Sequence, residues 1–285
     1  MKINSYLFLT VFLLISLSEV QAQKPSEKVK SKDWVDLLDE DLSKWEVWTG
    51  VPEPSVKNLP EGYEVPADGK PIKPLGLGDP KRIFTTEKDE EGDLMVHISG
   101  EIYAGLTSLE SYSDYHLTLL FKWAEKKYPP RMKRKRDSGL LYHCHGKHGA
   151  FWKVWKSCLE LQIQETDMGD LYALAGTSSV VKHDTTNHWD PTSELTKKTT
   201  KRSFDNESPH GEWTRIDLYV LDDKAIHMVN GEVVLALTDA RSKNGEKLKA
   251  GQLQMQSEAA EGYFKDMAIR PIKKFPKKLS KAAGF

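Results

Sequence analysis

The sequence predicts an all-β protein built as an antiparallel β-sandwich, and three observations support this. Apolar and polar residues alternate in several short segments, which is the period-two pattern of a strand with one buried face. Gly, Asp, Asn and Pro separate these segments. No stretch of twelve or more residues shows convincing helical periodicity. Many strands joined by polar turns favour two packed antiparallel sheets.

The alternation is clearest in residues 115–123, where aliphatic or aromatic residues occupy every odd position. The same pattern recurs in three further segments, residues 159–164, 215–220 and 253–258. Residues 225–229 and 232–237 flank Asn230-Gly231, a dipeptide typical of the type I′ turn of a hairpin. The sequence therefore predicts a strand in each of these six segments.

The first 22 residues have the organisation of a secretory signal peptide. Lys2 precedes an apolar run over residues 6–15, and Val20-Gln21-Ala22 places a small residue at the expected cleavage site. The run is short for a bilayer span, which weighs against the alternative of an N-terminal membrane anchor. We therefore expect a secreted or periplasmic protein with a flexible leader over residues 23–32. We expect no membrane insertion after the signal is removed.

The rest of the chain is predicted to form one domain. A chain of 285 residues, 39% hydrophobic and 29% charged, can bury a large core. Residues 50–82 hold seven of the 14 prolines and are interpreted as an ordered loop, since Trp45 and Trp48 before it resemble core anchors. The expected boundaries are a sandwich domain over residues 33–275 and a solvated basic tail over residues 276–285.

The charge balance argues against nucleic acid as a partner. Lys and Arg total 41 and Asp and Glu total 42, so the net charge is −1 and no global positive field exists. The locally basic run over residues 126–136 is interpreted as a solvated loop, with Arg136 turned inward beside Asp137. No Gly-rich phosphate loop and no Gly-x-Ser-x-Gly motif occurs, so the sequence gives no support for nucleotide or serine-hydrolase chemistry.

The cysteine content excludes a disulfide framework and a multi-cysteine zinc module, because there are only 2 cysteines. Cys144 and Cys158 lie on either side of a predicted hairpin loop. Two interpretations stay open for them. In an exported protein they can form a disulfide, or they can pack as buried thiols, since cysteine behaves as a small apolar residue.

Two predicted strands carry unusual polar faces. Each presents amide and carboxyl groups in a row, Glu160, Gln162 and Gln164 in one strand and Gln254, Gln256 and Glu258 in the other. Such rows of donors and acceptors suit the hydroxyls of a sugar, although an ordinary solvated sheet face is an equal alternative. Aromatic rings are expected beside a sugar because its C–H faces pack on them. The candidates are Trp152, Trp155, Trp189 and Trp213.

Three histidines fall within six positions, at 143, 145 and 148. In a strand His143 and His145 point the same way, and a carboxylate such as Glu160 would complete a divalent-metal site. A hydrogen-bonding or general-base histidine is the interpretation that we favour over a metal ligand. A pocket that pairs His143 with Glu160 would supply a base and an acid of different pKa.

The same strands carry a family resemblance. The matching segments are residues 121–123, 136–143, 160–165 with 169–170, 211–213 with 229–231, and 253–258. In this order they resemble the secreted 3-keto-disaccharide hydrolase domain family, formerly a domain of unknown function. The resemblance extends from about Trp34 to Ile272. It implies a concanavalin-like or laminin-G-like antiparallel β-sandwich of the jelly-roll type.

The resemblance further implies cleavage of glycosides already oxidised at C3. A C3 ketone acidifies the hydrogen at C2, so a base can remove it while the group on C1 leaves. Water then adds back, and the net result is hydrolysis. This elimination–hydration route needs one base, one acid and donors for the enolate oxygen. It does not need the two spaced carboxylates of ordinary glycosidases.

Roles for individual residues follow from the resemblance. His143 and Glu160 are the expected catalytic residues, with Gln162, Lys122 or a divalent metal at the enolate oxygen. If a metal binds, His143 and His145 are its expected ligands. The expected substrate-binding residues are Lys122, Trp123, Asp137, Tyr142, Gln162, Glu165, Asp170, Gln256 and Glu258.

Two other functions stay open from the sequence. One is a non-catalytic glycan-binding module on the same sandwich, and the other is an ordinary glycoside hydrolase. The pairing of His143 with Glu160 distinguishes the first of these from an enzyme, because a lectin needs partners for hydroxyls but no matched acid and base.

Overall fold

The computed structural model describes residues 33–285. The predicted signal peptide (residues 1–22) and leader (residues 23–32) lie outside the described residues, so both stay predictions. Within residues 33–285, no helix has the length and apolar character needed to cross a membrane.

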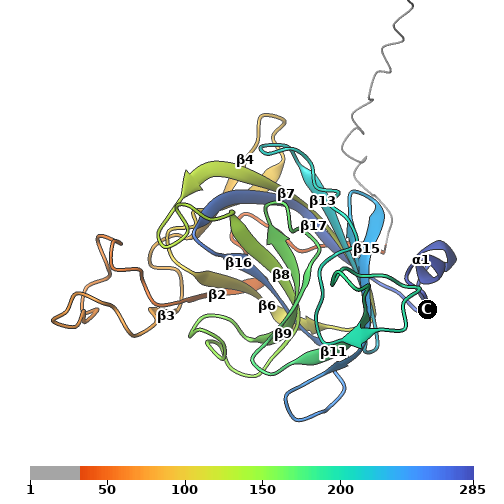
Figure 1. Cartoon of the computed structure of the whole chain (residues 1–285). Helices are drawn as coiled ribbons and strands as arrows, with labels where there is room; N and C mark the ends of the chain where they lie inside the picture. The colour runs from red at the N-terminus through yellow and green to blue at the C-terminus, as the bar shows by residue number, and fades with distance from the viewer. Residues whose placement is uncertain (1–32) are drawn as a thin grey trace, which may run out of the picture.

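Two antiparallel sheets pack face to face as a β-sandwich, which confirms the predicted fold class (Figure 1). The ten strands of the first sheet are β1 (Val35–Asp36), β4 (Phe84–Lys88), β5 (Leu94–Ile98), β7 (Tyr115–Lys127), β11 (Ser178–Lys182), β12 (Thr196–Lys197), β13 (Thr214–Leu221), β14 (Lys224–Val229), β15 (Glu232–Arg241) and β17 (Ala260–Pro271). Their spatial order is β12-β11-β15-β14-β13-β7-β17-β5-β4, with β1 also paired to β17.

The second sheet carries the candidate site. Its seven strands are β2 (Trp45–Thr49), β3 (Gly76–Leu77), β6 (Ala104–Tyr112), β8 (Asp137–His145), β9 (Ser157–Gln164), β10 (Leu171–Leu174) and β16 (Gly251–Ser257). Their spatial order is β10-β9-β8-β16-β6-β2-β3, so β9 and β16 both pair with β8.

The predicted strands are present, and their apolar faces form the core. Every odd-numbered residue of β7 from Tyr115 to Trp123 is buried between the sheets, as the alternation predicted. The apolar residues of β9, β13 and β16 join the same cluster. The hairpin is also confirmed, since Asn230 and Gly231 have φ values of 46° and 84° and join β14 to β15. A type I′ turn requires positive φ at both positions.

A polar link crosses the core between the two sheets. The Tyr142 hydroxyl on β8 lies 2.9 Å from Nε2 of His227 on β14, and Nδ1 of His227 lies 3.1 Å from the carbonyl oxygen of Gly169. Burial lowers the pKa of His227 to about 4, so its imidazole is neutral at neutral pH. Because only a protonated Nδ1 can donate to Gly169, Nε2 accepts the hydrogen bond from Tyr142. Tyr142 is therefore a core residue and does not face a sugar.

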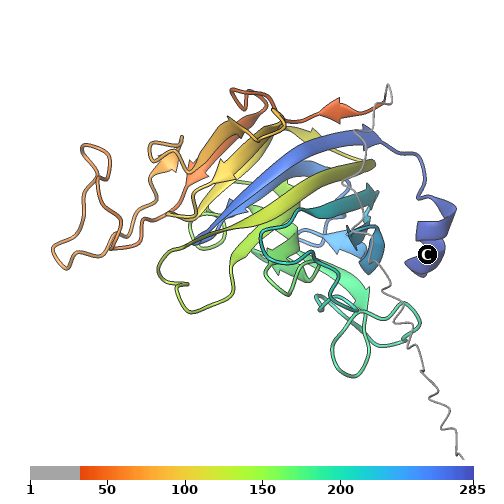
Figure 2. The same ribbon diagram turned by 90° about the horizontal axis from the view of Figure 1, so that it is seen from above.

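Two long segments lie outside the sandwich layers. The proline-rich residues 51–75 extend away from one end of the sheets (Figures 1 and 2), and Trp45 before them is buried as expected of a core anchor. At the other end, the tail expected to be solvated forms a short helix, α1 (Lys277–Ala282). Phe275 and Ala283 on either side of it are buried in the main core, while the lysines of the tail stay exposed. The tail is therefore partly packed, because its apolar residues anchor it to the core.

Replacing Tyr142 by Phe tests the link across the core. We expect Tyr142→Phe to lower the free energy of unfolding by about 1–3 kcal/mol, because it leaves Nε2 of His227 buried without a donor. Urea unfolding measures the change. Tyr63→Phe is the control, since the Tyr63 hydroxyl bonds the Lys73 carbonyl at the surface and should contribute less than about 0.5 kcal/mol. Equal effects of the two variants would contradict a structural role for the Tyr142 hydroxyl.

Candidate active site

The two polar rows converge on one face of the second sheet. Strands β9 and β16 flank β8, and their apolar residues point into the core. The alternate residues therefore point to the opposite, outer face. Pairing aligns Gln164 with Asp137 and Gln162 with Gly139 on β8, and an isolated bridge joins Asp137 to Glu258. Amides and carboxyl groups from three neighbouring strands thus meet around Asp137.

Three carboxyl groups lie at the centre of this face with one guanidinium. Asp137, Glu160 and Glu258 are 2%, 5% and 5% exposed. Arg131, from the connection between β7 and β8, forms ion pairs with Asp137 and with Glu258, the latter at 2.7 Å. Arg131 also donates to the Tyr103 hydroxyl. We call Asp137, Glu160, Glu258 and Arg131 the acid cluster.

Asp137 accepts hydrogen bonds from two amide side chains. Gln162 Nε2 donates to Oδ1 at 2.9 Å, and Gln164 Nε2 donates to Oδ2 at 2.7 Å. Burial and the nearby Glu258 raise the pKa of Asp137 to about 8, against the lowering effect of Arg131. Burial also raises the pKa of Glu258, to which Asp137 is hydrogen-bonded. These two acids therefore share one proton at neutral pH. The pair then carries a single negative charge, which Arg131 balances.

Glu160 is the member without a cation of its own. Arg131 forms its ion pairs with Asp137 and Glu258 and acts on Glu160 only as a more distant charge that lowers its pKa. Burial raises the pKa of Glu160 well above its usual value, and repulsion from Glu258 and Asp137 raises it further. Burial beside two other acids therefore favours the protonated form of this carboxyl group. A neutral buried carboxyl group can act as a general acid.

A glycine on β8 makes room for the Glu160 carboxyl group. A Cβ atom at Gly139 would collide with Oε1 of Glu160 and would lie 2.6 Å from Oε1 of Gln256. Gly105 on β6 plays the same part for Gln254, whose Cδ would lie 2.5 Å from an added Cβ. The two glycines let the long side chains of neighbouring strands lie flat across the sheet.

Several buried polar atoms around the acid cluster have no partner in the protein. They are Oε1 of Gln162, Oε1 of Gln256 and Nε of Arg131. Buried polar groups are nearly always hydrogen-bonded, so each such atom needs an explanation. Two acceptors and one donor beside protonated acids are the complement of a polyhydroxylated ligand.

The pairing of His143 with Glu160 is not formed. The β8–β9 register shifts between Tyr142 and His145, and His143 sits in this irregularity with φ of 51°. The irregularity breaks the strict alternation on which the pairing depended. His143 is buried, and both of its ring nitrogens lack a partner. Burial lowers the pKa of His143 to about 4, against smaller raising effects from the Ala250 backbone, Asp223 and Asp114.

The expected metal ligands do not assemble either. His145 Nδ1 bonds the carbonyl oxygen of His143 at 2.9 Å, and His148 Nε2 bonds Glu46 at 3.0 Å. Across residues 33–285, no three His, Cys, Asp or Glu side chains are grouped so that they could hold a metal ion.

Lys122 and Trp123 lie on the other sheet. The Lys122 ammonium stands 4.6 Å from the centre of the Trp213 ring and 5.4 Å from that of Tyr263. Trp123 is buried in the main core. Strand β7 belongs to the first sheet, so neither side chain reaches the acid cluster.

Glu165 and Asp170 lie in the turns that follow β9. Glu165 pairs with Arg136 at 3.1 Å, and Asp170 pairs with Arg202 at 3.1 Å. The expectation that Arg136 turns inward beside Asp137 is wrong, because Arg131 takes that position.

Sequence reasoning missed Arg131, Tyr103 and Tyr172. Tyr172 on β10 is the cross-strand partner of Glu160 and is 47% exposed. No periodic pattern marks these residues, since each reaches the site through long-range strand pairing or a loop. Of the tryptophans proposed as sugar platforms, Trp155 and Trp189 are buried.

The two cysteines are free thiols in the structure. Cys144 and Cys158 are buried together with Leu141, Val154 and Trp155 in a small apolar cluster, separate from the main core. Leu141 alternates with Gly139, so this cluster covers the outer face of β8 next to the acid cluster. The residues between β8 and β9 therefore shield one side of the candidate site.

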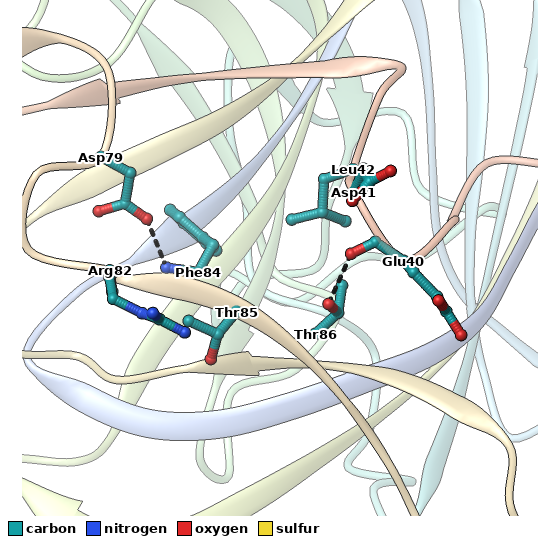
Figure 3. A pocket seen from close by; sticks show the side chains of 8 residues that line it. All are labelled: Glu40, Asp41, Leu42, Asp79, Arg82, Phe84, Thr85 and Thr86. Atoms are coloured by element: carbon teal, nitrogen blue, oxygen red, sulfur yellow. Dashed lines mark hydrogen bonds between the residues drawn. The ribbon is translucent and has the colours of Figure 1, made fainter.

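A surface hollow of about 290 Å³ lies elsewhere, against the edge strand β4 (Figure 3). Its polar groups are already used by the fold. Asp79 accepts hydrogen bonds from the backbone N–H groups of Ile83 and Phe84, and Thr86 donates to the carbonyl oxygen of Glu40. None of the residues predicted to bind substrate lines this hollow, so it is not the candidate site.

The raised pKa values predict how stability depends on pH. An acid with a higher pKa in the folded state binds more protons when folded, so the free energy of unfolding decreases as pH rises between its unfolded and folded pKa. For Asp137 that window runs from 3.8 to about 8. We expect the free energy of unfolding to fall from about pH 4 to about pH 8, and Glu160→Gln to reduce the slope of this fall. Urea unfolding across this pH range measures the slope, and Glu61→Gln at an exposed position is the control. A slope that Glu160→Gln leaves unchanged would contradict the protonated state of Glu160.

A methyl group at Gly139 tests the placement of Glu160. We expect Gly139→Ala to lower kcat by about 10²-fold, because it displaces the carboxyl group from its position over β8. Gly105→Ala is the matched control, since its methyl group meets Gln254 and not an acid. Steady-state kinetics on the substrate proposed below, with circular dichroism to verify folding, gives the comparison. Equal losses in both variants would point to a general defect in packing.

Comparison with known proteins identifies the family. Residues 33–270 match the model of the 3-keto-alpha-glucoside-1,2-lyase-like domain. No curated protein sequence matches the chain. Among solved structures, a putative glycosyl hydrolase from Parabacteroides distasonis ATCC 8503 is similar in fold, with a TM-score of 0.51 and 13% identity over 87% of this chain and 100% of that one.

A second structure, the carbohydrate-binding module CBM66 from Bacillus subtilis, gives a TM-score of 0.41 and 11% identity over 66% of this chain and 91% of that one. At 13% identity, the likeness to the putative glycosyl hydrolase concerns the fold alone. The family match, in contrast, covers nearly all the described residues, including the whole acid cluster. The chain therefore belongs to the 3-keto-alpha-glucoside-1,2-lyase-like domain family, and its function is that of a carbohydrate-active enzyme.

Proposed function

We propose that the protein cleaves the glycosidic bond of 3-keto-glycosides, including disaccharides, by elimination followed by hydration. The acid cluster is the observation that carries the proposal. It combines a protonated carboxyl group, a pair of acids that shares one proton, and unpartnered acceptors on one sheet face. A protein that only binds glycans needs hydroxyl partners but no such set of raised pKa values.

We assign the role of general base to the pair of Asp137 and Glu258. At neutral pH it carries one negative charge, so it can accept the proton from C2 of the substrate. The C3 ketone makes this hydrogen acidic, and the electron pair moves toward the C3 oxygen. The Arg131 guanidinium and the Tyr103 hydroxyl lie beside the pair and can stabilise the charge that develops there.

We assign the role of general acid to Glu160. As the C1–O bond breaks, its carboxyl group can protonate the departing oxygen and become a carboxylate. The product of this step is an unsaturated 3-keto sugar. Water then adds at C1, and a proton returns to C2, so that the sum of both steps is hydrolysis. This assignment replaces His143, which lies in the strand irregularity, by acids that the structure brings together.

We also propose that the protein acts after export from the cytoplasm. The support is the predicted signal peptide over residues 1–22. N-terminal sequencing of the protein recovered from the medium or periplasm tests this, with a new N-terminus near Gln23 as the expected result and an intact Met1 as the contradictory one.

Substrate preference and the Glu160 variant test the reaction. Wild-type protein is incubated with a 3-keto-disaccharide and with the unmodified disaccharide, and the released monosaccharide is quantified. We expect release from the 3-keto sugar only, and a loss of about 10²-fold or more in Glu160→Gln. Glu207→Gln is the matched control, because burial also raises the pKa of Glu207, to about 7, in a loop outside the acid cluster. Release from both sugars would favour an ordinary hydrolase, and release from neither would favour a binding module.

Solvent deuterium separates elimination from direct displacement. In D₂O the elimination–hydration route returns a deuteron to C2, so the released 3-keto sugar should carry deuterium at that carbon beyond the exchange seen without enzyme. Mass spectrometry and proton NMR measure it. Product formed with its C2 hydrogen fully retained would contradict the proposed route.

A further inference from the structure

An exposed tyrosine stands directly beside the buried acid. Tyr172 and Glu160 are cross-strand partners on β10 and β9. Directly opposed residues on one face of an antiparallel pair have Cβ atoms about 5 Å apart. The phenol ring therefore rises from the sheet next to the proposed general acid, on the β10 side of the acid cluster.

The fold makes little use of this ring. Leu171 and Leu174 on the same strand are buried, but Tyr172 is 47% exposed. Its backbone pairs with Glu160 in the strand ladder, and among residues 33–285 its side chain takes no part in the hydrogen bonds and ring contacts that hold the fold together. Half of a large apolar surface is thus left in water at the edge of a sheet, without a structural role.

The aromatic residue on the opposite side of the same face is different. Trp48 on β2 stacks on His148 with ring centres 5.3 Å apart, and its indole N–H donates to the carbonyl oxygen of Lys153 at 3.0 Å. The fold therefore already uses both the face and the polar edge of that indole. Of these two rings, Tyr172 is the one available to a ligand.

The groups around Tyr172 complement the rest of a sugar ring. A pyranose has C–H groups that pack on an aromatic face and hydroxyl groups at its edge that need partners. Oε1 of Gln162 and Oε1 of Gln256, on the same sheet face, are buried acceptors without a donor. Burial raises the pKa of Tyr172, and the negative charge of Asp170 raises it further, so the phenol stays uncharged in the working range.

We propose that Tyr172 is the stacking platform for the pyranose ring whose glycosidic bond is cleaved, and so a substrate-binding residue of the site. This inference rests on the proposed function for the identity of the sugar. The ring would hold the C1–O bond beside Glu160 while the hydroxyl groups bond the two free amide oxygens. Stacking requires that the covered sugar face present C–H groups, so gluco-configured rings are preferred over rings with an axial hydroxyl on that face.

Substitutions at Tyr172 separate stacking from a role of the hydroxyl. We expect Tyr172→Ala to raise KM for a 3-keto-glucoside about tenfold with a smaller effect on kcat, since it removes both the stacked ring and the apolar area that the ring would cover. Tyr172→Phe keeps the ring and should change KM less than about twofold. Tyr263→Ala, a tyrosine beside Lys122 on the first sheet, is the control and should leave both constants unchanged. A change in kcat alone, or equal effects of Phe and Ala, would overturn the proposal.

Saturation-transfer NMR distinguishes failure of this inference from failure of the proposed function. The probe is the unmodified disaccharide, and aromatic protons of the protein are irradiated. We expect strong transfer to the C–H protons of one sugar face in wild type and Tyr172→Phe, and its loss in Tyr172→Ala. If wild type turns over the 3-keto sugar but shows no such difference, the platform is wrong and the proposed function stands. If binding follows Tyr172 but no 3-keto sugar is cleaved, the reaction is wrong and the platform stands.

Discussion

The site depends on three carboxyl groups that are buried beside a single guanidinium. Ionising all of them would leave two uncompensated negative charges away from water, which is strongly unfavourable. The structure avoids this by retaining protons, and burial is accordingly the largest cause of the raised pKa of Asp137, Glu160 and Glu258. Burying three acids together does not stabilise the fold. Held protons are useful where a proton must be given and another taken within one small volume.

The architecture explains why these groups meet. The neighbouring strands β9, β8 and β16 present every second side chain to the same face. The middle strand, β8, contributes Gly139, which leaves room for the Glu160 carboxyl group. Loops then supply what the strands lack. Arg131 enters from the β7–β8 connection, and the residues between β8 and β9 cover the neighbouring apolar patch. The sheet thus sets the spacing of the acids, and the loops determine their charge and their access to solvent.

Period-two alternation was sufficient to predict the sandwich, the main strands and the polar rows of β9 and β16, because it reflects burial of one strand face. It failed at His143, where a local irregularity ends the alternation that pairing with Glu160 required. The alternation also did not identify Arg131 or Tyr172 as site residues. Their positions depend on loop geometry and on which strands become neighbours. Within the basic run, the sequence could not distinguish Arg131 from Arg136, because both are arginines in a polar loop.

The protonation of Glu160 at neutral pH is the central claim, and infrared difference spectroscopy tests it most directly. The carbonyl stretch of a protonated carboxylic acid is separate from the bands of carboxylates. The account predicts protonated-acid absorption in wild-type protein at neutral pH and its shift in D₂O. In Glu160→Gln the Glu160 component should be lost, while absorption from the proton shared by Asp137 and Glu258 remains. Spectra in which wild type and Glu160→Gln show the same protonated-acid signal at neutral pH would contradict it.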